Sequence, residues 1–200
     1  MSNYFSKIAI IFVALAALQA EAQQLKLGLP YYGGTGCPGG SASANLSPDG
    51  SALSILFDSY VVEAGGNTGK RLDRKSCNVS IPVQVPNGYS VAVFQVDYRG
   101  FTSIPRGGRA QLDAEYFWAG VRGPRITRAF TSSISDIYTV TDQLVASTLV
   151  WSQCGASVNL RANTSMMVTT NTRSEQALAT VDSADVTSGL IYHIRFRRCN

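Results

Sequence analysis

Alternating apolar and polar residues dominate the sequence. In the clearest run Val79, Ile81, Val83 and Val85 alternate with mostly polar neighbours, the period-2 pattern of a β-strand with one buried face. Near the C-terminus, residues 190–197 alternate in the same way. Strands are predicted at residues 41–46, 52–57, 79–85, 89–98, 111–118, 126–131, 137–141, 147–151, 157–160, 165–170, 179–181 and 190–197.

Turn signals pair some of these strands into hairpins. Ser47-Pro48-Asp49-Gly50 has the residue order of a type I turn, and Pro86-Asn87-Gly88 turns the chain after the run that ends at Val85. Pro82 indicates an edge position or a bulge, and residues 63–75 are expected to form a polar loop. The inward face of the strand after the second turn is predicted to carry Ala92, Phe94, Val96 and Tyr98.

No segment shows a sustained apolar spacing of three and four residues, so little helix is expected. Many short strands separated by turns are typical of an antiparallel sheet structure. We therefore predict an all-β fold, an antiparallel β-sandwich or flattened barrel of about ten short strands.

The first 22 residues have the features of a secretory signal peptide. Lys7 supplies a positive charge, residues 8–18 are apolar, and Ala20-Glu21-Ala22 matches a signal-peptidase site. Cleavage is predicted after Ala22, which leaves residues 23–200 as a single secreted domain. No later stretch is long and apolar enough for a transmembrane helix.

Composition narrows the class of partner. Hydrophobic residues make up 45% of the 200 residues and charged residues 15%, so a sizeable core is expected. The formal net charge is +4, without the dense Lys and Arg clusters typical of nucleic-acid binders. Nucleic acid is therefore not the expected partner.

Cys37, Cys77, Cys154 and Cys199 are widely spaced and form no close pair of the kind that zinc sites use. In an exported chain they are expected to form two disulfides rather than a metal site. Four cysteines allow three connectivities, of which the pairing of sequence neighbours is favoured. Each such bond would close a loop of about 40 residues and would add about 4 kcal/mol to the free energy of unfolding in the chain-entropy model.

Several short motifs occur in a fixed order along the chain. They are Gly34-Thr35-Gly36-Cys37-Pro38-x-Gly40-Ser41, Ser47-Pro48-Asp49-Gly50, Phe57-Asp58-x-Tyr60, Arg74-Lys75-x-Cys77, Tyr98-Arg99-Gly100, Trp151-Ser152-x-Cys154-Gly155, Asp182-Ser183-x-Asp185 and Arg198-Cys199.

This ordered set resembles a family of small secreted proteins of fungi and bacteria, catalogued as domain of unknown function 4360, over nearly the whole mature chain. The resemblance implies secretion, a single β-rich domain and disulfides between sequence neighbours, but no particular activity. Ala64-Gly65-Gly66 departs from the family, which more often has a proline beside glycine here.

No catalytic or cofactor motif stands out. His193 is expected on the polar face of the last strand, as a surface or half-buried residue, and no G-x-S-x-G, H-E-x-x-H or P-loop is present. A copper site built on an N-terminal histidine is excluded because the mature chain should begin with Gln23. Neither a cofactor nor a bound metal is predicted, since turn caps explain Asp49 and Asp182-Ser183-Ala184-Asp185 without calcium.

Paired carboxylates remain an alternative, because such pairs can form in three dimensions. Asp113 and Glu115 would share one face of a strand about 7 Å apart, a separation that suits inverting glycoside hydrolysis. A solvated outer face is the simpler interpretation of both residues. The other candidates are Asp58, Glu63 and Asp97.

Arginines and tyrosines supply the candidate binding residues. Arg122 and Arg125 would join Arg195 and Arg197 in one patch for acidic polysaccharide or anionic headgroups if the loop at 122–128 lies near the last strand. Dispersed solubilising charge is the competing interpretation. Tyr31 and Tyr32 are candidates for stacking on sugar rings.

Asn45, Asn78 and Asn163 begin N-glycosylation sequons, which act only in a eukaryotic secretory route.

The sequence thus predicts a secreted, non-catalytic protein that binds polysaccharide or forms part of a surface or extracellular matrix. A glycan-active enzyme and a membrane-active effector are the alternatives.

Overall fold

The computed structural model describes residues 25–118, 120–131, 135–181 and 190–199. The predicted signal peptide, its cleavage after Ala22 and the acidic segment Asp182–Asp185 lie outside the described residues.

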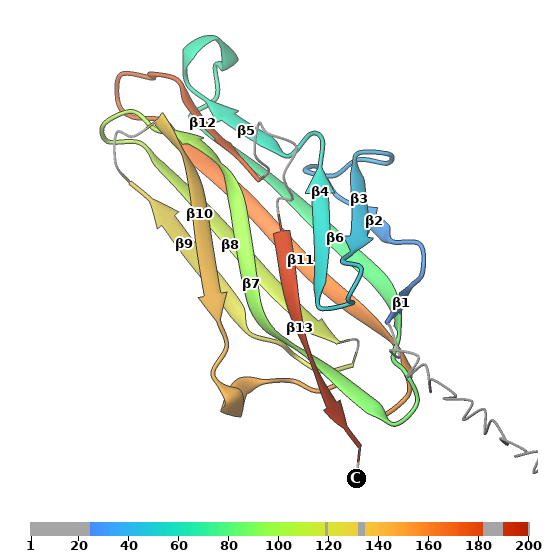
Figure 1. The fold of residues 1–200 in the computed structure, drawn as a ribbon. Coiled ribbons are helices and arrows are strands. Elements are labelled where there is room, and N and C mark those ends of the chain that lie inside the picture. The colour runs from blue at the N-terminus through green and yellow to red at the C-terminus, as the bar shows by residue number, and fades with distance from the viewer. Residues whose placement is uncertain (1–24, 119, 132–134, 182–189, 200) are drawn as a thin grey trace, which may run out of the picture.

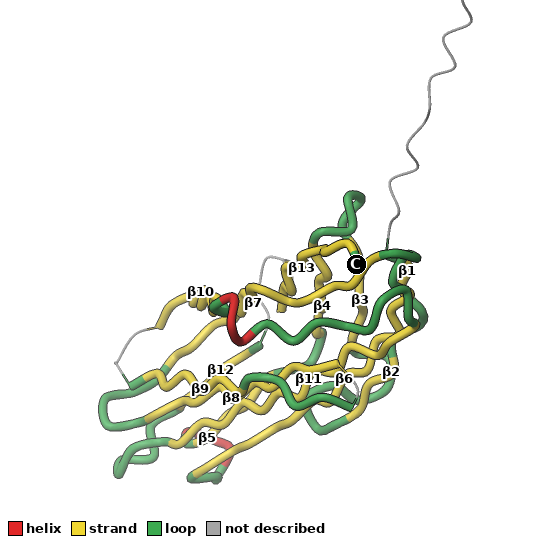
Figure 2. The backbone as a smooth tube through the Cα atoms, turned by 90° about the horizontal axis from the view of Figure 1, so that it is seen from below, coloured by secondary structure: helices red, strands yellow, loops and turns green. Residues whose placement is uncertain are grey.

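Thirteen strands of the described chain form two antiparallel sheets, which appear as two layers in Figure 2. The predicted sandwich is therefore confirmed. Sheet A has the order β1-β6-β11-β8-β9 with β2 also on β6, and sheet B has the order β3-β4-β13-β7-β12-β5 with β10 also on β7. Figure 1 shows how the strands of the two sheets overlie one another.

The strands of sheet A are β1 (Lys26–Leu27), β2 (Tyr31–Gly33), β6 (Leu72–Gln84), β8 (Arg109–Trp118), β9 (Arg125–Phe130) and β11 (Ser157–Thr169). The strands of sheet B are β3 (Ala42–Leu46), β4 (Ala52–Phe57), β5 (Val61–Ala64), β7 (Tyr89–Ser103), β10 (Ser135–Gln143), β12 (Ala177–Thr180) and β13 (Leu190–Arg198). Two 3-10 turns, η1 (Gly66–Thr68) and η2 (Ala146–Thr148), are the helical elements described.

The core lies between the two sheets. The apolar residues that alternate with polar residues along the strands point into it. Ile81 of β6 and Leu112 of β8 face inward from sheet A, and they meet Leu53 of β4 and Leu190 of β13 from sheet B. Trp118, also buried, donates its indole N–H to the carbonyl of Val150 at 3.0 Å, which satisfies its polar group.

The predicted inward face of β7 is confirmed at Val96 and Tyr98 and is wrong at Phe94 and at Ala92, which pairs with the outward-facing Arg195. Val93 pairs with Ile194 and Gln95 pairs with His193, so Phe94 is an extra residue in β7, a β-bulge. The bulge shifts the alternation, so that Val91 and Val93 are buried before it, and Val96 and Tyr98 after it. Phe94 is half-buried instead of lying in the core.

Other boundaries also differ from the prediction. The expected strand at 147–151 overlaps η2 and is not a strand. On either side of it, Leu144 and Ser152 donate backbone N–H groups to the carbonyls of Phe94 and Val91 as isolated hydrogen bonds and not as a ladder. The two strands expected at 157–160 and 165–170 are the single strand β11.

Pro82 lies within β6, which runs between β11 and the short strands β1 and β2 and is therefore not a full edge strand. Its carbonyl accepts a hydrogen bond from Gly28 at 2.8 Å. A strand residue directs its nitrogen and its carbonyl to the same side, so the missing N–H of Pro82 faces the β1–β2 connection and removes no bond to β11.

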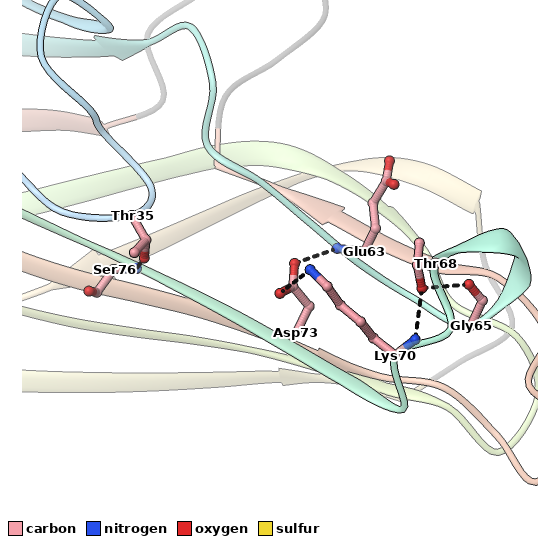
Figure 3. Close-up of polar contacts among 7 residues, drawn as sticks. All are labelled: Thr35, Glu63, Gly65, Thr68, Lys70, Asp73 and Ser76. Atoms are coloured by element: carbon pink, nitrogen blue, oxygen red, sulfur yellow. Dashed lines mark hydrogen bonds and ion pairs between the residues drawn. The ribbon is translucent and has the colours of Figure 1, made fainter.

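The predicted loop at 63–75 is mostly regular, since it contains the end of β5, η1 and the start of β6. Figure 3 shows the contacts that close it: Asp73 accepts the backbone N–H of Glu63 at 3.1 Å and pairs with Lys70 at 3.0 Å. Gly65 and Gly66 adopt positive φ angles of 74° and 53°, a region that proline cannot reach.

Both predicted disulfides are present, Cys37–Cys77 and Cys154–Cys199. Four of the family motifs contain the bonded cysteines. A Cβ on Gly36 would lie 2.4 Å from the ring of Tyr60, which explains why a glycine precedes Cys37. In the described part of the chain no helix is both long enough and apolar enough to span a membrane.

Candidate functional site

The outer face of β13 carries a row of basic side chains. His193, Arg195 and Arg197 point away from the core, whereas the intervening Ile194 is buried and Phe196 partly so. Side chains two residues apart on a strand are separated by about 7 Å. The alternation therefore places imidazole and guanidinium groups at regular intervals along one line of sheet B.

The bulge in β7 places an aromatic ring beside this row. The Phe94 ring centroid lies 6.0 Å from that of His193, and the guanidinium carbon of Arg195 lies 4.7 Å from the Phe94 centroid. This is the geometry of a cation–π contact. The contact holds the Arg195 side chain against the sheet while leaving the residue exposed.

A second stacked arginine follows on the same strand. The guanidinium carbon of Arg197 lies 4.2 Å from the ring centroid of Trp151, which comes from the segment along the edge of β7. Beside Arg197 is an open hollow, and its lining includes Arg198, Ser90 and the Cys154–Cys199 disulfide.

Asp97 of β7 is the hydrogen-bonding centre of this face. Its Oδ1 accepts the hydroxyl of Thr141 at 2.6 Å, and its Oδ2 accepts the Nε2–H of His193 at 2.6 Å. The amide of Gln95 donates to the same carboxylate at 3.2 Å and in turn accepts from Gln143 at 3.4 Å. The network links β10, β7 and β13 across the face.

Partial burial alone would raise the pKa of Asp97, but the hydrogen bonds from Thr141, His193 and Gln95 outweigh it and lower the pKa below its ordinary value. Asp97 is therefore an anion at neutral pH. Its carboxylate is the partner of His193, whereas Arg195 and Arg197 have no carboxylate partner among the described residues.

A carboxylate that orients a histidine is one part of a catalytic triad, so Asp97 and His193 must be compared with such a triad. A triad also requires a hydroxyl or thiol on the far side of the imidazole. In this network the hydroxyl of Thr141 bonds to Asp97, and no described hydroxyl or thiol bonds to His193. The described part of this network therefore lacks the nucleophile that a triad requires.

The structure separates the arginines that the sequence grouped. Arg125 begins β9 and lies opposite Glu115 on the outer face of sheet A, while Arg195 and Arg197 lie on the outer face of sheet B. Arg122 is exposed in the loop before β9. The condition for one joint patch is therefore not met, because the outer faces of a sandwich point in opposite directions.

The tyrosine pair is also divided. Tyr31 pairs with Ser80 on the outer face of sheet A and is 71% exposed. Tyr32 pairs with Val79, packs against the core, and accepts the N–H of Gly40 at its hydroxyl at 3.1 Å. Tyr32 is therefore a structural residue, and Tyr31 keeps its role as a stacking candidate.

Asp113 and Glu115 share the outer face of β8, as predicted. Burial alone would raise the pKa of Asp113, but hydrogen bonds from Thr127 at 2.6 Å and Gln111 at 3.0 Å, with nearby arginines, lower it below its ordinary value. A glycosidase acid needs the opposite shift. Among the described residues no His, Cys, Asp and Glu side chains form a group of three or more suited to a metal ion.

Three features of the β13 face were missed by sequence reasoning. Asp97 and His193 are 96 residues apart and meet only through strand pairing. Phe94 was assigned to the core because no sequence signal marks the bulge. Trp151 belongs to the motif Trp151-Ser152-x-Cys154-Gly155, and this motif is the sequence signal that points to its position.

Fold and disulfides together define a two-disulfide antiparallel β-sandwich with a basic, aromatic outer face. The chain belongs to the family described as Domain of unknown function (DUF4360), whose model matches residues 23–199. A relative named as an uncharacterized secreted protein of Arthroderma benhamiae is 32% identical over 169 residues, which cover 84% of this chain and 69% of the relative.

Two solved structures show distant likeness. A family 11 carbohydrate-binding module from Clostridium thermocellum, in complex with a β-1,3-1,4-mixed-linked tetrasaccharide, is 11% identical; the match covers 84% of this chain and 88% of the module, with a TM-score of 0.25. The Eiger TNF structure from S. frugiperda is 16% identical over 64% of this chain and 96% of that one, with a TM-score of 0.23. Likeness at this level carries no weight for function.

Proposed function

We propose that the protein is exported and is a non-catalytic binding module for acidic polysaccharide, with the outer face of β13 and β7 as its binding surface. The observation that carries the proposal is the pair of stacked arginines, Arg195 over Phe94 at 4.7 Å and Arg197 over Trp151 at 4.2 Å. Neither guanidinium is neutralised by a carboxylate among the described residues.

Guanidinium groups bind carboxylates through two parallel hydrogen bonds, which favours uronic-acid and similar groups as ligands. Stacking restricts each arginine before the ligand arrives, so less side-chain entropy is lost on binding. The spacing of about 7 Å along β13 allows two anionic groups of one polymer to bind together. His193 extends the row by one further position.

Export is supported by three independent features. The N-terminus has the pattern of a signal peptide. The relative that is 32% identical over 169 residues is named an uncharacterized secreted protein, and the two disulfides suit an oxidising compartment.

A polysaccharide partner is favoured over a membrane. The large exposed apolar side chains come from separate elements, for example Leu29 after β1, Leu72 on β6 and Ile137 on β10. Membrane-active surfaces need such side chains gathered into one patch. The β13 face instead combines cations with amide and hydroxyl groups.

Binding to polygalacturonate and to its fully methyl-esterified form tests the proposal by isothermal titration calorimetry. The acidic form should bind, with an affinity that falls as salt is added, because screening weakens exposed charge pairs. R195A/R197A should bind about tenfold more weakly. The matched variant R122A/R125A loses the same charge elsewhere and should stay within about twofold of the parent.

Equal binding of both polysaccharide forms, or equal losses in the two double variants, would overturn the proposal. The same mixtures test the absence of catalysis, since the chain length of the polysaccharide should not change during incubation. Release of new reducing ends would instead support the glycan-active alternative.

A further inference from the structure

The outer face of sheet A carries an aromatic side chain at each end of one row across four strands. Tyr31 of β2 pairs with Ser80 of β6, Ser80 with Arg161 of β11, and Arg161 with Phe117 of β8. Neighbouring strands lie about 4.8 Å apart, so the two aromatic positions are separated by about 14 Å. These strands form the lower layer in Figure 2.

The next row contains amide and carboxylate groups. Gly33 of β2, Asn78 of β6, Asn163 of β11 and Glu115 of β8 are paired in order, two residues along each strand from the aromatic row. No hydrogen bond within the described residues uses the side chains of Asn78, Asn163 or Glu115. The row thus offers donors and acceptors next to the aromatic rings.

Charges of both signs lie near these rows. Glu115 of β8 is paired in register with Arg125 of β9, Arg125 and Arg74 act on the carboxylate of Asp113, and Arg161 lies in the aromatic row itself. A polyanion would meet two carboxylates here, unlike on the face of β13. Aromatic planes beside neutral hydrogen-bonding groups suit hydroxyl-rich, uncharged rings.

We propose that the outer face of sheet A is a second binding surface, which takes an uncharged glycan chain across β2, β6, β11 and β8 between Tyr31 and Phe117. This surface is independent of the β13 face. If the proposed acidic-polysaccharide site also holds, the two opposite faces bridge an acidic and a neutral polymer, as a matrix cross-linker would.

The test uses the full mature chain, produced in a bacterial periplasm so that Asn78 and Asn163 carry no glycan. Its binding to soluble neutral polysaccharides, a mixed-linkage β-glucan, a xyloglucan and a mannan, is measured by affinity electrophoresis. Y31A should lose about tenfold in affinity for the polysaccharide that binds, about 1.4 kcal/mol, while Y31F should retain most of it.

Leu72 supplies a matched control because it is 50% exposed on the same face of β6, far from the aromatic row. L72A should bind like the parent, and so should R195A/R197A, which separates this proposal from that for β13. The absence of neutral-glycan binding, or equal losses in Y31A and L72A, overturns the inference. A shift of Y31A from dimer to monomer without lost glycan binding also overturns it, because the face would then join two copies.

Discussion

One extra residue in β7 determines which side chains form the β13 face. Without the bulge, Phe94 would point into the core and Arg195 would lose its aromatic partner. Bulges often re-aim a side chain at the cost of one ladder position. Here the neighbours Val93 and Phe94 have opposite environments, with Val93 4% exposed inside and Phe94 half-buried outside.

Alanine at these two positions should therefore separate stability from binding. V93A removes buried methyl groups and should lower the free energy of unfolding by about 1 to 3 kcal/mol, without changing affinity for polygalacturonate. F94A should cost about 1 kcal/mol or less in stability but weaken binding. Urea denaturation and calorimetry measure both. If F94A lost the stability and V93A lost the binding instead, the bulge would be absent.

Asp97 should make stability depend on pH in the acid range. Its pKa is lower in the folded state than in the unfolded state, so its contribution is complete above its ordinary pKa of about 3.9. The contribution is lost progressively as the pH falls from that value through the lower pKa of the folded state. In urea titrations at pH 7 and pH 3, D97N should show a smaller stability difference between the two pH values than the parent. An unchanged difference would contradict the hydrogen bonds assigned to Asp97.

At the scale of elements, each disulfide anchors a different part of the sandwich. Cys37–Cys77 holds the N-terminal segment against β6, where Gly36 packs on the ring of Tyr60. Cys154–Cys199 ties the end of β13, two residues beyond Arg197, to the segment before β11. The two bonds close loops of 40 and 45 residues, so similar contributions to stability are expected.

Removing each bond should therefore have the same effect on stability and different effects on binding. C37A/C77A and C154A/C199A should each lose about 4 kcal/mol of unfolding free energy in the chain-entropy model. The second variant should also bind polygalacturonate more weakly, because the end of β13 frays beside Arg197. Equal affinity in the two variants would mean that the β13 terminus is not part of the site.

Close packing at Gly36 gives a further test. A Cβ at this position would lie 2.4 Å from the Tyr60 ring, whereas a Cβ on Gly39 would meet nothing within 4 Å. G36A should lower the free energy of unfolding by about 1 to 3 kcal/mol. G39A should be neutral or slightly stabilising, since alanine restricts the unfolded chain. Thermal and urea unfolding distinguish the two, and equal behaviour would contradict the packing.

At the scale of the whole molecule, the fold class could be predicted because alternation is a local signal. The alternation over 111–118, for example, predicts which side chains of β8 face inward, and this prediction does not depend on which strands pair with β8. The site could not be predicted in the same way, since it depends on which strands pair. Arg125 and Arg195 lie on opposite sheets, and Asp97 meets His193 only because β7 pairs with β13. Segments that follow a sheet edge without a ladder, such as Val150 and Trp151, look like strands in sequence.

The most direct test of the central claim is an NMR titration of the mature protein with an oligogalacturonate. We expect amide and side-chain shifts to concentrate on the β13 face, at Phe94, Gln95, His193, Arg195 and Arg197, together with the indole N–H of Trp151. Shifts that concentrate on sheet A around Tyr31 and Phe117, or no shifts at saturating ligand, would contradict it.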